Sequence, residues 1–161
     1  MTGTVAVDFV GVGGGMLALT RRPKAKSLPA MRSLGATHLV TLLSRREGAG
    51  AVGAAARAAG LEWVWVDLAN ADPPPPARDG ELAKVLLDTA GSLRDGAAVV
   101  VHCSAGIHRT GMFAHALLRA SGLSGDDARL TLARLRTPTS EGVGEHRLAW
   151  GEHLCTTMGW R

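Results

Sequence analysis

The stretch that decides the fold is VVVHCSAGIHRTG, residues 99 to 111. Its first residues are apolar and β-branched, which favours a buried strand that ends near His102. A short loop with a glycine follows over 104–108, and the residues from Thr110 onward have the apolar periodicity of a helix. A strand, a tight loop and a helix in this order point the loop's backbone N–H groups and the helix N-terminus at one spot. The stretch therefore predicts a preformed anion-binding site.

Apolar runs of strand length alternate with helical stretches along the rest of the chain. We expect strands over 5–10, 16–20, 38–43, 61–68 and 97–102, and helices over 27–34, 47–59, 78–93, 110–120, 124–135 and 139–158. The runs HLVTLL and AVVVHC are nearly continuous, which is typical of strands covered on both faces. The alternation predicts an α/β fold. We expect a single domain over residues 1–161, with a central, mainly parallel sheet of about five strands and helices on both faces.

Length, composition and cysteine count restrict the class of protein. With 161 residues, of which 46% are hydrophobic and 20% charged, the chain has the composition of an ordinary globular domain. Its apolar runs are too short to span a membrane, and its N-terminus lacks the layout of a signal peptide. Two cysteines, Cys103 and Cys155, cannot form a disulfide framework. We therefore expect a cytoplasmic protein that does not bind a membrane.

The net charge of +4 comes from arginine, because only three of the 18 basic residues are lysines. The planar guanidinium of arginine suits the recognition of phosphate and carboxylate oxygens. The arginines are scattered in short pairs, and only 4% of the residues are aromatic, so no stacking platform for bases is visible. We expect no nucleic-acid partner.

The residues around the loop fit nucleophilic chemistry at phosphorus. Cys103 ends the strand, and the positive field of the loop favours its thiolate, the form that attacks phosphorus. Arg109 can hold two phosphoryl oxygens with its guanidinium. Thr110 is placed to donate its hydroxyl to the sulfur, and His102 is placed to order the loop through a hydrogen bond to its backbone. This chemistry needs no metal and no cofactor.

Other interpretations of the cysteines explain less of the stretch. A cysteine at the end of a buried strand is often a small core residue, and this is the better interpretation of Cys155. A redox pair of Cys103 and Cys155 finds no support in their separation along the chain. A metal site needs more ligands than His102 and Cys103 supply, and a Walker-type nucleotide loop needs a Gly-Lys-Ser/Thr that is absent here.

HCSAGIHRTG resembles the His-Cys-x5-Arg-Ser/Thr signature of the cysteine-dependent protein tyrosine phosphatase superfamily, and the chain is similar in size to its compact dual-specificity branch. RRP at 21–23, LGATHLVTLLSRREG at 34–48 and LARLRTP at 132–138 resemble the corresponding stretches of that branch. The resemblance implies an enzyme in which Cys103 is the nucleophile. It also implies that the phosphoryl group is bound by the loop residues Ser104, Ala105, Gly106, Ile107, His108 and Arg109.

The resemblance further implies a general acid on the loop after the preceding strand. Asp72 lies 31 residues upstream of Cys103, and Asp67 lies 36 residues upstream. We favour Asp72, because the proline run at 73–76 follows it directly and stiffens the segment that carries it. Asp67 is then assigned to the end of the strand or to the order of the loop, and Asp79 to the cap of the next helix.

Several other positions have more than one interpretation. Glu47 matches an acidic position that pairs with the surroundings of the signature arginine in the family, and it equally fits a solvated carboxylate at a helix start. Glu145 or His146 stands where some members place a water-positioning glutamine, which is absent here. A histidine at position 108 resembles the motif of plant and fungal phosphatases linked to inositol pyrophosphates. Those enzymes also carry a lysine earlier in the loop, where this chain has Ser104 and Ile107.

The sequence therefore indicates a phosphatase that hydrolyses phosphate monoesters through a phosphocysteine intermediate, on phosphotyrosine and on phosphoserine or phosphothreonine of proteins. One alternative is a phosphatase of inositol phosphates or another non-protein phosphoester. A second is a phosphate-binding pseudophosphatase. The expected partner is a phosphorylated protein or a small phosphoester, and we take a monomer as the default oligomeric state.

Overall fold

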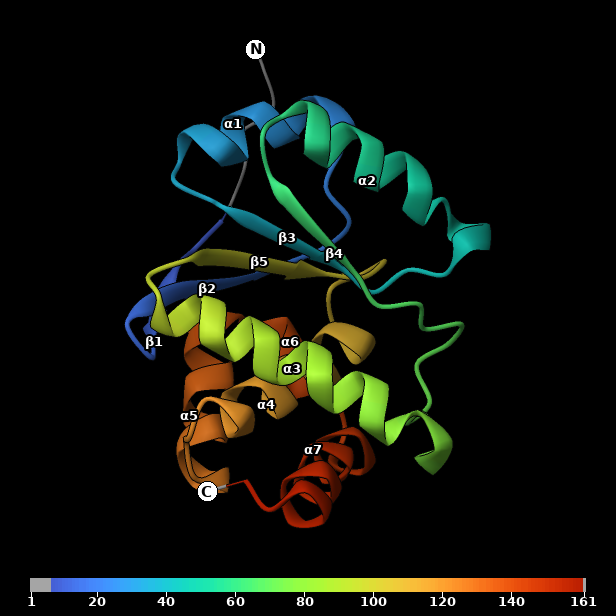
Figure 1. Cartoon of the computed structure of the whole chain (residues 1–161), viewed down its shortest axis with the longest axis vertical. Coiled ribbons are helices and arrows are strands. Elements are labelled where there is room, and N and C mark those ends of the chain that lie inside the picture. Colours follow the sequence, from blue (N-terminus) through green and yellow to red (C-terminus); the bar gives the residue numbers. More distant parts are fainter. Residues whose placement is uncertain (1–6, 161) are drawn as a thin grey trace.

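In the computed structural model, which describes residues 7–160, a five-stranded sheet is packed between two helical layers (Figure 1). The strands are β1 (Val10–Val12), β2 (Gly15–Thr20), β3 (His38–Thr41), β4 (Glu62–Trp65) and β5 (Ala98–His102). The helices are α1 (Leu28–Ser33), α2 (Ala49–Ala58), α3 (Asp79–Arg94), α4 (His108–Ala120), α5 (Gly125–Leu135), α6 (Thr137–Gly142) and α7 (Glu145–Met158). Short 3-10 turns are η1 (Ala25–Ser27), η2 (Arg45–Glu47) and η3 (Pro76–Arg78). The predicted α/β fold is confirmed.

Strand β5 lies at the centre of the sheet. The strand order is β1-β2-β5-β3-β4, and every neighbouring pair except β1 and β2 is parallel. Val99 and Val101 face the core on one side of β5, and Val100 faces the core on the other side. Burial on both faces explains why this strand is continuously apolar. The carboxyl ends of parallel strands share one edge of the sheet, so the loop after β5 emerges in the middle of that edge.

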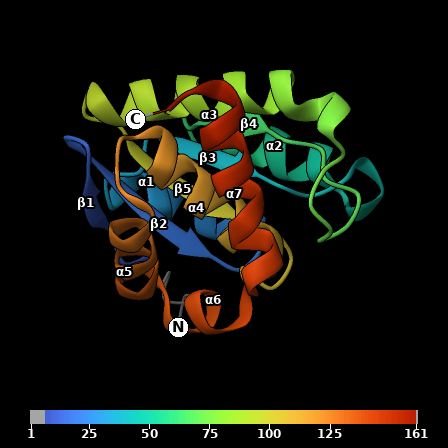
Figure 2. The ribbon, with the colours of Figure 1, turned by 90° about the horizontal axis from the view of Figure 1, so that it is seen from below.

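The two helical layers differ in size. Helices α1 and α2 cover one face of the sheet, and α3 to α7 cover the other face (Figure 1, Figure 2). Helix α4 continues from the loop after β5 and is buried along most of its length, because it packs against α3, α5 and α7 as well as the sheet. None of the helices within residues 7–160 is long and apolar enough to cross a membrane.

Two strands are shorter than predicted, β3 (38–41 against 38–43) and β4 (62–65 against 61–68), and the structure differs further at three places. The first two residues of the strand predicted over 5–10 and the residues before them lie outside the described part, and β1 begins only at Val10. Helix α4 begins at His108, two residues earlier than predicted. The predicted helix over 139–158 is two helices, α6 and α7, because Gly144 takes a φ of 88° that a helix cannot contain.

Gly15, the first residue of β2, fits only because it has no side chain. A Cβ atom at this position would lie 2.5 Å from the carbonyl oxygen of Leu93 and 3.0 Å from its Cα, and neither backbone atom can move alone. We predict that Gly15→Ala lowers the free energy of unfolding by about 1–3 kcal/mol through overpacking. Gly11→Ala is the matched control in β1, since nothing lies within 4 Å of its Cβ position. Chemical denaturation of both variants tests this, and equal effects would contradict it.

Candidate active site

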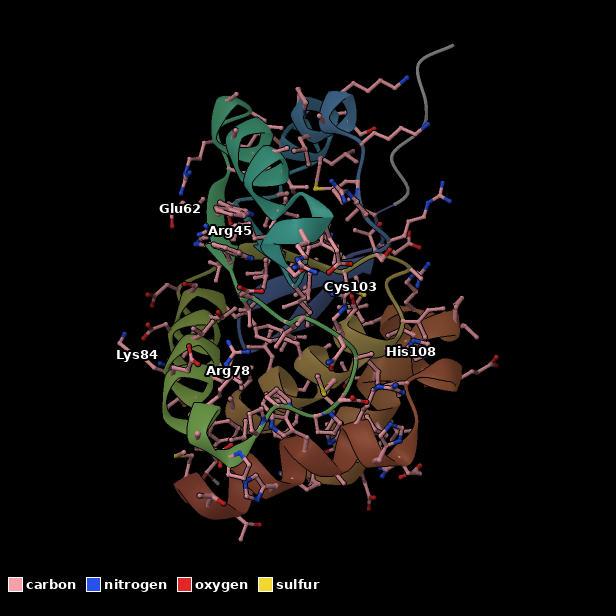
Figure 3. All side chains as sticks on the ribbon, turned by 90° about the vertical axis from the view of Figure 1, so that its right-hand side faces the viewer. Arg45, Glu62, Arg78, Lys84, Cys103 and His108 are labelled. Carbon is pink, nitrogen blue, oxygen red and sulfur yellow. The ribbon has the colours of Figure 1, made fainter. Side chains whose placement is uncertain are left out.

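Cys103 follows β5 directly and lies at the middle of the sheet edge described above. Its side chain is buried. In the view of Figure 3 it lies between Arg45 of the η2 turn and His108 at the start of α4. The residues predicted to bind phosphate, 104–109, form the turn from β5 into α4, with Arg109 in the first turn of that helix. The sequence motif therefore occupies the strand–loop–helix arrangement that an anion site requires.

The backbone of the loop is held by contacts from outside it. The N–H of Arg22 donates to the carbonyl oxygen of Ser104 over 2.9 Å. The carbonyl oxygen of Gly106 accepts from Nη1 of Arg136 over 2.9 Å and from the hydroxyl of Thr139. A peptide N–H points opposite to the carbonyl of the same peptide unit. Because the carbonyl groups of Ser104 and Gly106 are held outward by these hydrogen bonds, the N–H groups of residues 105 and 107 point toward the inside of the loop.

Gly106 is required by the loop's position against the sheet. It has a φ of 73°, and a Cβ atom there would lie 2.5 Å from the carbonyl oxygen of Thr20 at the end of β2. Any side chain would push the loop away from the backbone of the neighbouring strand. The glycine of the motif is thus explained by a close approach of two backbone segments.

Arg109 is held by Glu47 in a two-pronged ion pair. Its Nη1 and Nη2 atoms lie 2.7 and 2.8 Å from the two carboxylate oxygens of Glu47, and Nη1 also donates to the carbonyl oxygen of Leu68 over 2.9 Å. Hydrogen bonding to Arg109 is the largest cause that lowers the pKa of Glu47 to about 2. The structure therefore supports the interpretation in which Glu47 pairs with the signature arginine.

Glu47 is itself fixed by the turn that carries it. The N–H of Ser44 donates to Oε1 of Glu47 over 3.0 Å, which forms a capping box at the start of η2. Glu47, and more weakly Cys103, raise the pKa of Arg109, since both acidic groups lie beside the same guanidinium. The guanidinium is therefore oriented by the protein without a ligand and lies next to the cysteine.

His102 is fully buried at the end of β5 and contacts the loop's backbone. Its Nδ1 lies 3.0 Å from the carbonyl oxygen of Cys103, and its Nε2 lies 2.8 Å from Oγ1 of Thr41. Burial is the main cause that lowers the pKa of His102 to about 4, and the charges of Arg22 and Arg109 act in the same direction. The imidazole is therefore neutral at pH 7, as a residue that orders a loop rather than exchanges protons would be.

Within the described residues, Thr110 carries the one buried side-chain polar atom of the motif that has no hydrogen-bond partner. Its Oγ1 is buried and makes no hydrogen bond to the protein within residues 7–160. A buried hydroxyl without a partner is costly, and such groups are often found where a ligand or a reacting atom supplies the bond. This fits the predicted role of Thr110 toward the sulfur, which stays a prediction.

Asp72 and Asp67 both lie exposed on the loop between β4 and η3. Asp72 lines a hollow of about 300 Å³ with Leu68 and the first three prolines of the run. Its backbone N–H donates to Oδ1 of Asn70 over 2.9 Å. The neighbouring Ala71 is tied to α7, since Nε of Arg147 donates to its carbonyl oxygen over 2.7 Å. Through Leu68 the same loop touches Arg109. The loop is thus anchored at Leu68 and Ala71, on the N-terminal side of the favoured acid.

Several predicted positions have other contacts than the sequence suggested. Asp79 does not cap α3, because its carboxylate binds Nε2 of His153 over 2.8 Å. Glu145 forms an exposed ion pair with Arg129. The sequence did not predict the hydrogen bond from Arg136 to the carbonyl oxygen of Gly106, although Arg136 lies inside the stretch LARLRTP on which the resemblance rests. Within residues 7–160 no group of three or more acidic, histidine or cysteine side chains is arranged to hold a metal ion.

The comparisons with known proteins agree with this geometry. A family model described as "Tyrosine phosphatase family" matches residues 77–129, which include the loop and the whole of α3 and α4. The match is a likeness over the part of the chain that carries the loop. A search of curated proteins finds no match to this chain.

Several solved structures have the same fold as this chain. Kinase associated phosphatase (KAP), solved with its catalytic cysteine replaced by serine, has a TM-score of 0.78 at 15% identity, over 99% of this chain and 98% of that chain. Human DUSP28 has a TM-score of 0.71 at 18% identity, over 94% and 97%. Tk-PTP in its active form has a TM-score of 0.69 at 22% identity, over 88% and 91%. The chain therefore has the same compact fold as these phosphatases.

The ion pair between Glu47 and Arg109 predicts a pH dependence of stability. The pKa of Glu47 is about 2 in the folded state, against 4.5 for the free side chain, so its contribution is present above pH 4.5 and is lost as the pH falls toward 2. Glu47→Gln should lower the free energy of unfolding at neutral pH by about 2 kcal/mol and flatten this acid limb. Glu141→Gln, an exposed carboxylate outside the site, is the control. Denaturation curves at several pH values measure the free energy of unfolding. The same loss of stability below pH 4.5 in Glu47→Gln as in the wild type would contradict the assignment.

Proposed function

We propose that this protein is a phosphatase that hydrolyses phosphate monoesters through a phosphocysteine intermediate, with phosphotyrosine and phosphoserine or phosphothreonine of proteins as substrates. The proposal rests on one observation: the loop after β5 holds Cys103 beside the guanidinium of Arg109, which Glu47 has already oriented. An oriented guanidinium can bind two equatorial oxygens of a phosphoryl group while a nucleophile attacks the phosphorus from the loop side.

In the first step the Cys103 thiolate attacks phosphorus, and an S–P bond forms as the bond from phosphorus to the leaving oxygen breaks. The N–H groups of residues 104–109 and the Arg109 guanidinium bind the phosphoryl oxygens, whose charge would otherwise oppose the attack. Asp72 gives its proton to the leaving oxygen, so that an alcohol or phenol departs instead of its anion. His102 takes no part in proton transfer and keeps the loop ordered.

In the second step water attacks the phosphorus of the phosphocysteine. Asp72, now ionised, takes a proton from the water, and the S–P bond breaks to release inorganic phosphate. The sulfur leaves as a thiolate, and the unpartnered hydroxyl of Thr110 is the donor that would stabilise it. Both steps use side chains of this chain alone, so we propose that no metal or cofactor takes part.

A protein substrate is supported by a solved relative. P. aeruginosa TpbA, solved in complex with pTyr, has a TM-score of 0.60 at 20% identity with this chain, over 89% of it. We propose the same kind of ligand here, in a reducing compartment such as the cytoplasm, where two unpaired cysteines persist. The whole chain, 1–161, acts as a single domain in this proposal.

The covalent mechanism predicts distinct effects of the two central residues. Cys103→Ser and Arg109→Ala should both abolish turnover of an aryl phosphate, and only Cys103→Ser should keep phosphate affinity, because the oxygen-binding guanidinium remains in that variant. A phosphate-release assay measures turnover, and isothermal titration calorimetry with inorganic phosphate measures affinity. Substantial turnover by Cys103→Ser, or loss of wild-type turnover with a chelator, would refute the mechanism.

The choice of Asp72 as acid predicts a dependence on the leaving group. Protonation helps a poor leaving group such as tyrosine most, and general acids contribute roughly a hundredfold to ten-thousandfold in rate. Asp72→Asn should therefore slow phosphotyrosine turnover far more than turnover of an activated aryl phosphate, whereas Asp67→Asn should not. Asp67→Asn is a matched control, because it removes the other exposed carboxylate of the same loop. The opposite pattern would assign the role to Asp67.

The substrate class is tested by comparing phosphopeptides with inositol phosphates and nucleotides at equal concentration. We expect the highest kcat/KM for phosphopeptides, with Cys103→Ser as the blank. A higher kcat/KM for inositol phosphates would replace the protein substrate by the non-protein alternative. Binding of every ligand without any turnover would instead identify a pseudophosphatase.

A further inference from the structure

A line of polar contacts runs across three strands into the catalytic loop. The indole Nε1 of Trp63, in the edge strand β4, lies 2.8 Å from Oγ1 of Thr41 in β3. The same Oγ1 lies 2.8 Å from Nε2 of His102 in β5, whose Nδ1 lies 3.0 Å from the carbonyl oxygen of Cys103. Thr41 and His102 are directly paired in the parallel register, so their side chains share the face covered by α1 and α2.

Chemistry fixes the direction of every hydrogen bond in this line. The carbonyl oxygen of Cys103 can only accept, so Nδ1 of His102 must carry a proton. Burial and two nearby arginines keep the imidazole neutral, so its Nε2 is bare and must accept the hydroxyl proton of Thr41. The indole N–H of Trp63 can only donate, and it occupies a lone pair of the same Thr41 oxygen. Each group therefore donates toward the cysteine.

We propose that Thr41 and Trp63 are positioning residues of the catalytic loop, which act through His102 on the carbonyl group of Cys103. Thr41 holds the imidazole ring in place by its bond to Nε2. Trp63 fixes the Thr41 hydroxyl so that its proton points at the ring. The Nδ1–H bond then polarises the Cys103 carbonyl and lowers the negative potential that this oxygen exerts on the nearby sulfur, which favours the thiolate. The inference rests on the proposed function only in that the thiolate is the nucleophile.

The neighbouring Trp65 provides a control that distinguishes a positioning role of Trp63 from a packing role. Trp65 stacks on Trp63 with ring centroids 5.8 Å apart, and its indole N–H donates to the carbonyl oxygen of Leu43 over 2.8 Å. Both indoles are half-buried, both lie in β4, and each makes one hydrogen bond to β3 or the residues after it. Only the bond of Trp63 leads to His102. Trp65→Phe is therefore a matched control for Trp63→Phe.

The first readout is the reactivity of Cys103, measured as its rate of alkylation by iodoacetamide at neutral pH. Thr41→Val, which keeps the side-chain shape but removes the hydroxyl, should slow alkylation by about three- to tenfold, the value of one hydrogen bond. Trp63→Phe should slow it by about threefold, since Thr41 can still donate but is no longer fixed. Thr41→Ser should restore the wild-type rate, and Trp65→Phe should leave the rate unchanged.

The second readout is the hydrogen-bond line itself, observed by long-range ¹H–¹⁵N NMR of the imidazole and by the indole N–H signals. In the wild type we expect a neutral His102 with its proton on Nδ1. Thr41→Val should shift both the His102 signals and the Trp63 indole signal, and it should leave the Trp65 indole signal in place. A packing defect would move the two indoles alike.

Equal effects of Trp63→Phe and Trp65→Phe on alkylation would overturn the inference, and so would a Thr41→Val protein that alkylates at the wild-type rate. If Thr41→Val fails to fold, the comparison of the two tryptophan variants still decides. Neither readout uses a phosphoester. The positioning role can therefore fail while turnover stands, and it can stand in a protein that turns over none of the substrates tested.

Discussion

The guanidinium of Arg109 is where the separate parts of this protein meet. It binds the carboxylate of Glu47 from the η2 turn, the carbonyl oxygen of Leu68 from the loop after β4, and lies beside Cys103 of its own loop. Because Arg109 is mostly buried, its charge must be compensated, and Glu47 supplies this compensation before any anion arrives. One charged side chain thus determines the relative positions of three segments that are distant in the sequence.

The local part of this arrangement could be predicted from the sequence, because it depends on neighbours along the chain. The continuous apolar run of β5 reflects burial on both faces, and Gly106 marks the close approach of the loop to β2. The residue pattern gives no such signal for partners that are distant along the chain, and the family resemblance alone left Glu47 with two interpretations. Glu47 lies 62 residues from Arg109, and a carboxylate at a helix start looks the same in sequence whether it is solvated or paired. The contacts of Arg136 and Arg147 were missed for the same reason.

The burial of His102 has an energetic side. Its pKa is about 4 in the folded protein against 6.5 when exposed, so the unfolded chain takes up a proton first as the pH falls. Stability is therefore lost progressively from about pH 6.5 toward pH 4. Glu47 continues the loss at lower pH. His102 and Glu47, which hold the loop after β5 and its arginine, thus make the fold sensitive to acid over adjoining pH ranges.

The strand order has a consequence for synthesis of the chain. Strand β5 lies between β2 and β3, yet it is the last of the five described strands along the sequence. While the ribosome has made only the first ninety or so residues, β2 and β3 have no partner between them, and each exposes an open edge that can pair with another nascent chain. Completion of the sheet and synthesis of Cys103, the proposed nucleophile, coincide, since Cys103 directly follows the strand that fills the gap. A truncated chain therefore lacks this cysteine and the middle of its sheet together, and is a substrate for chaperones or proteases.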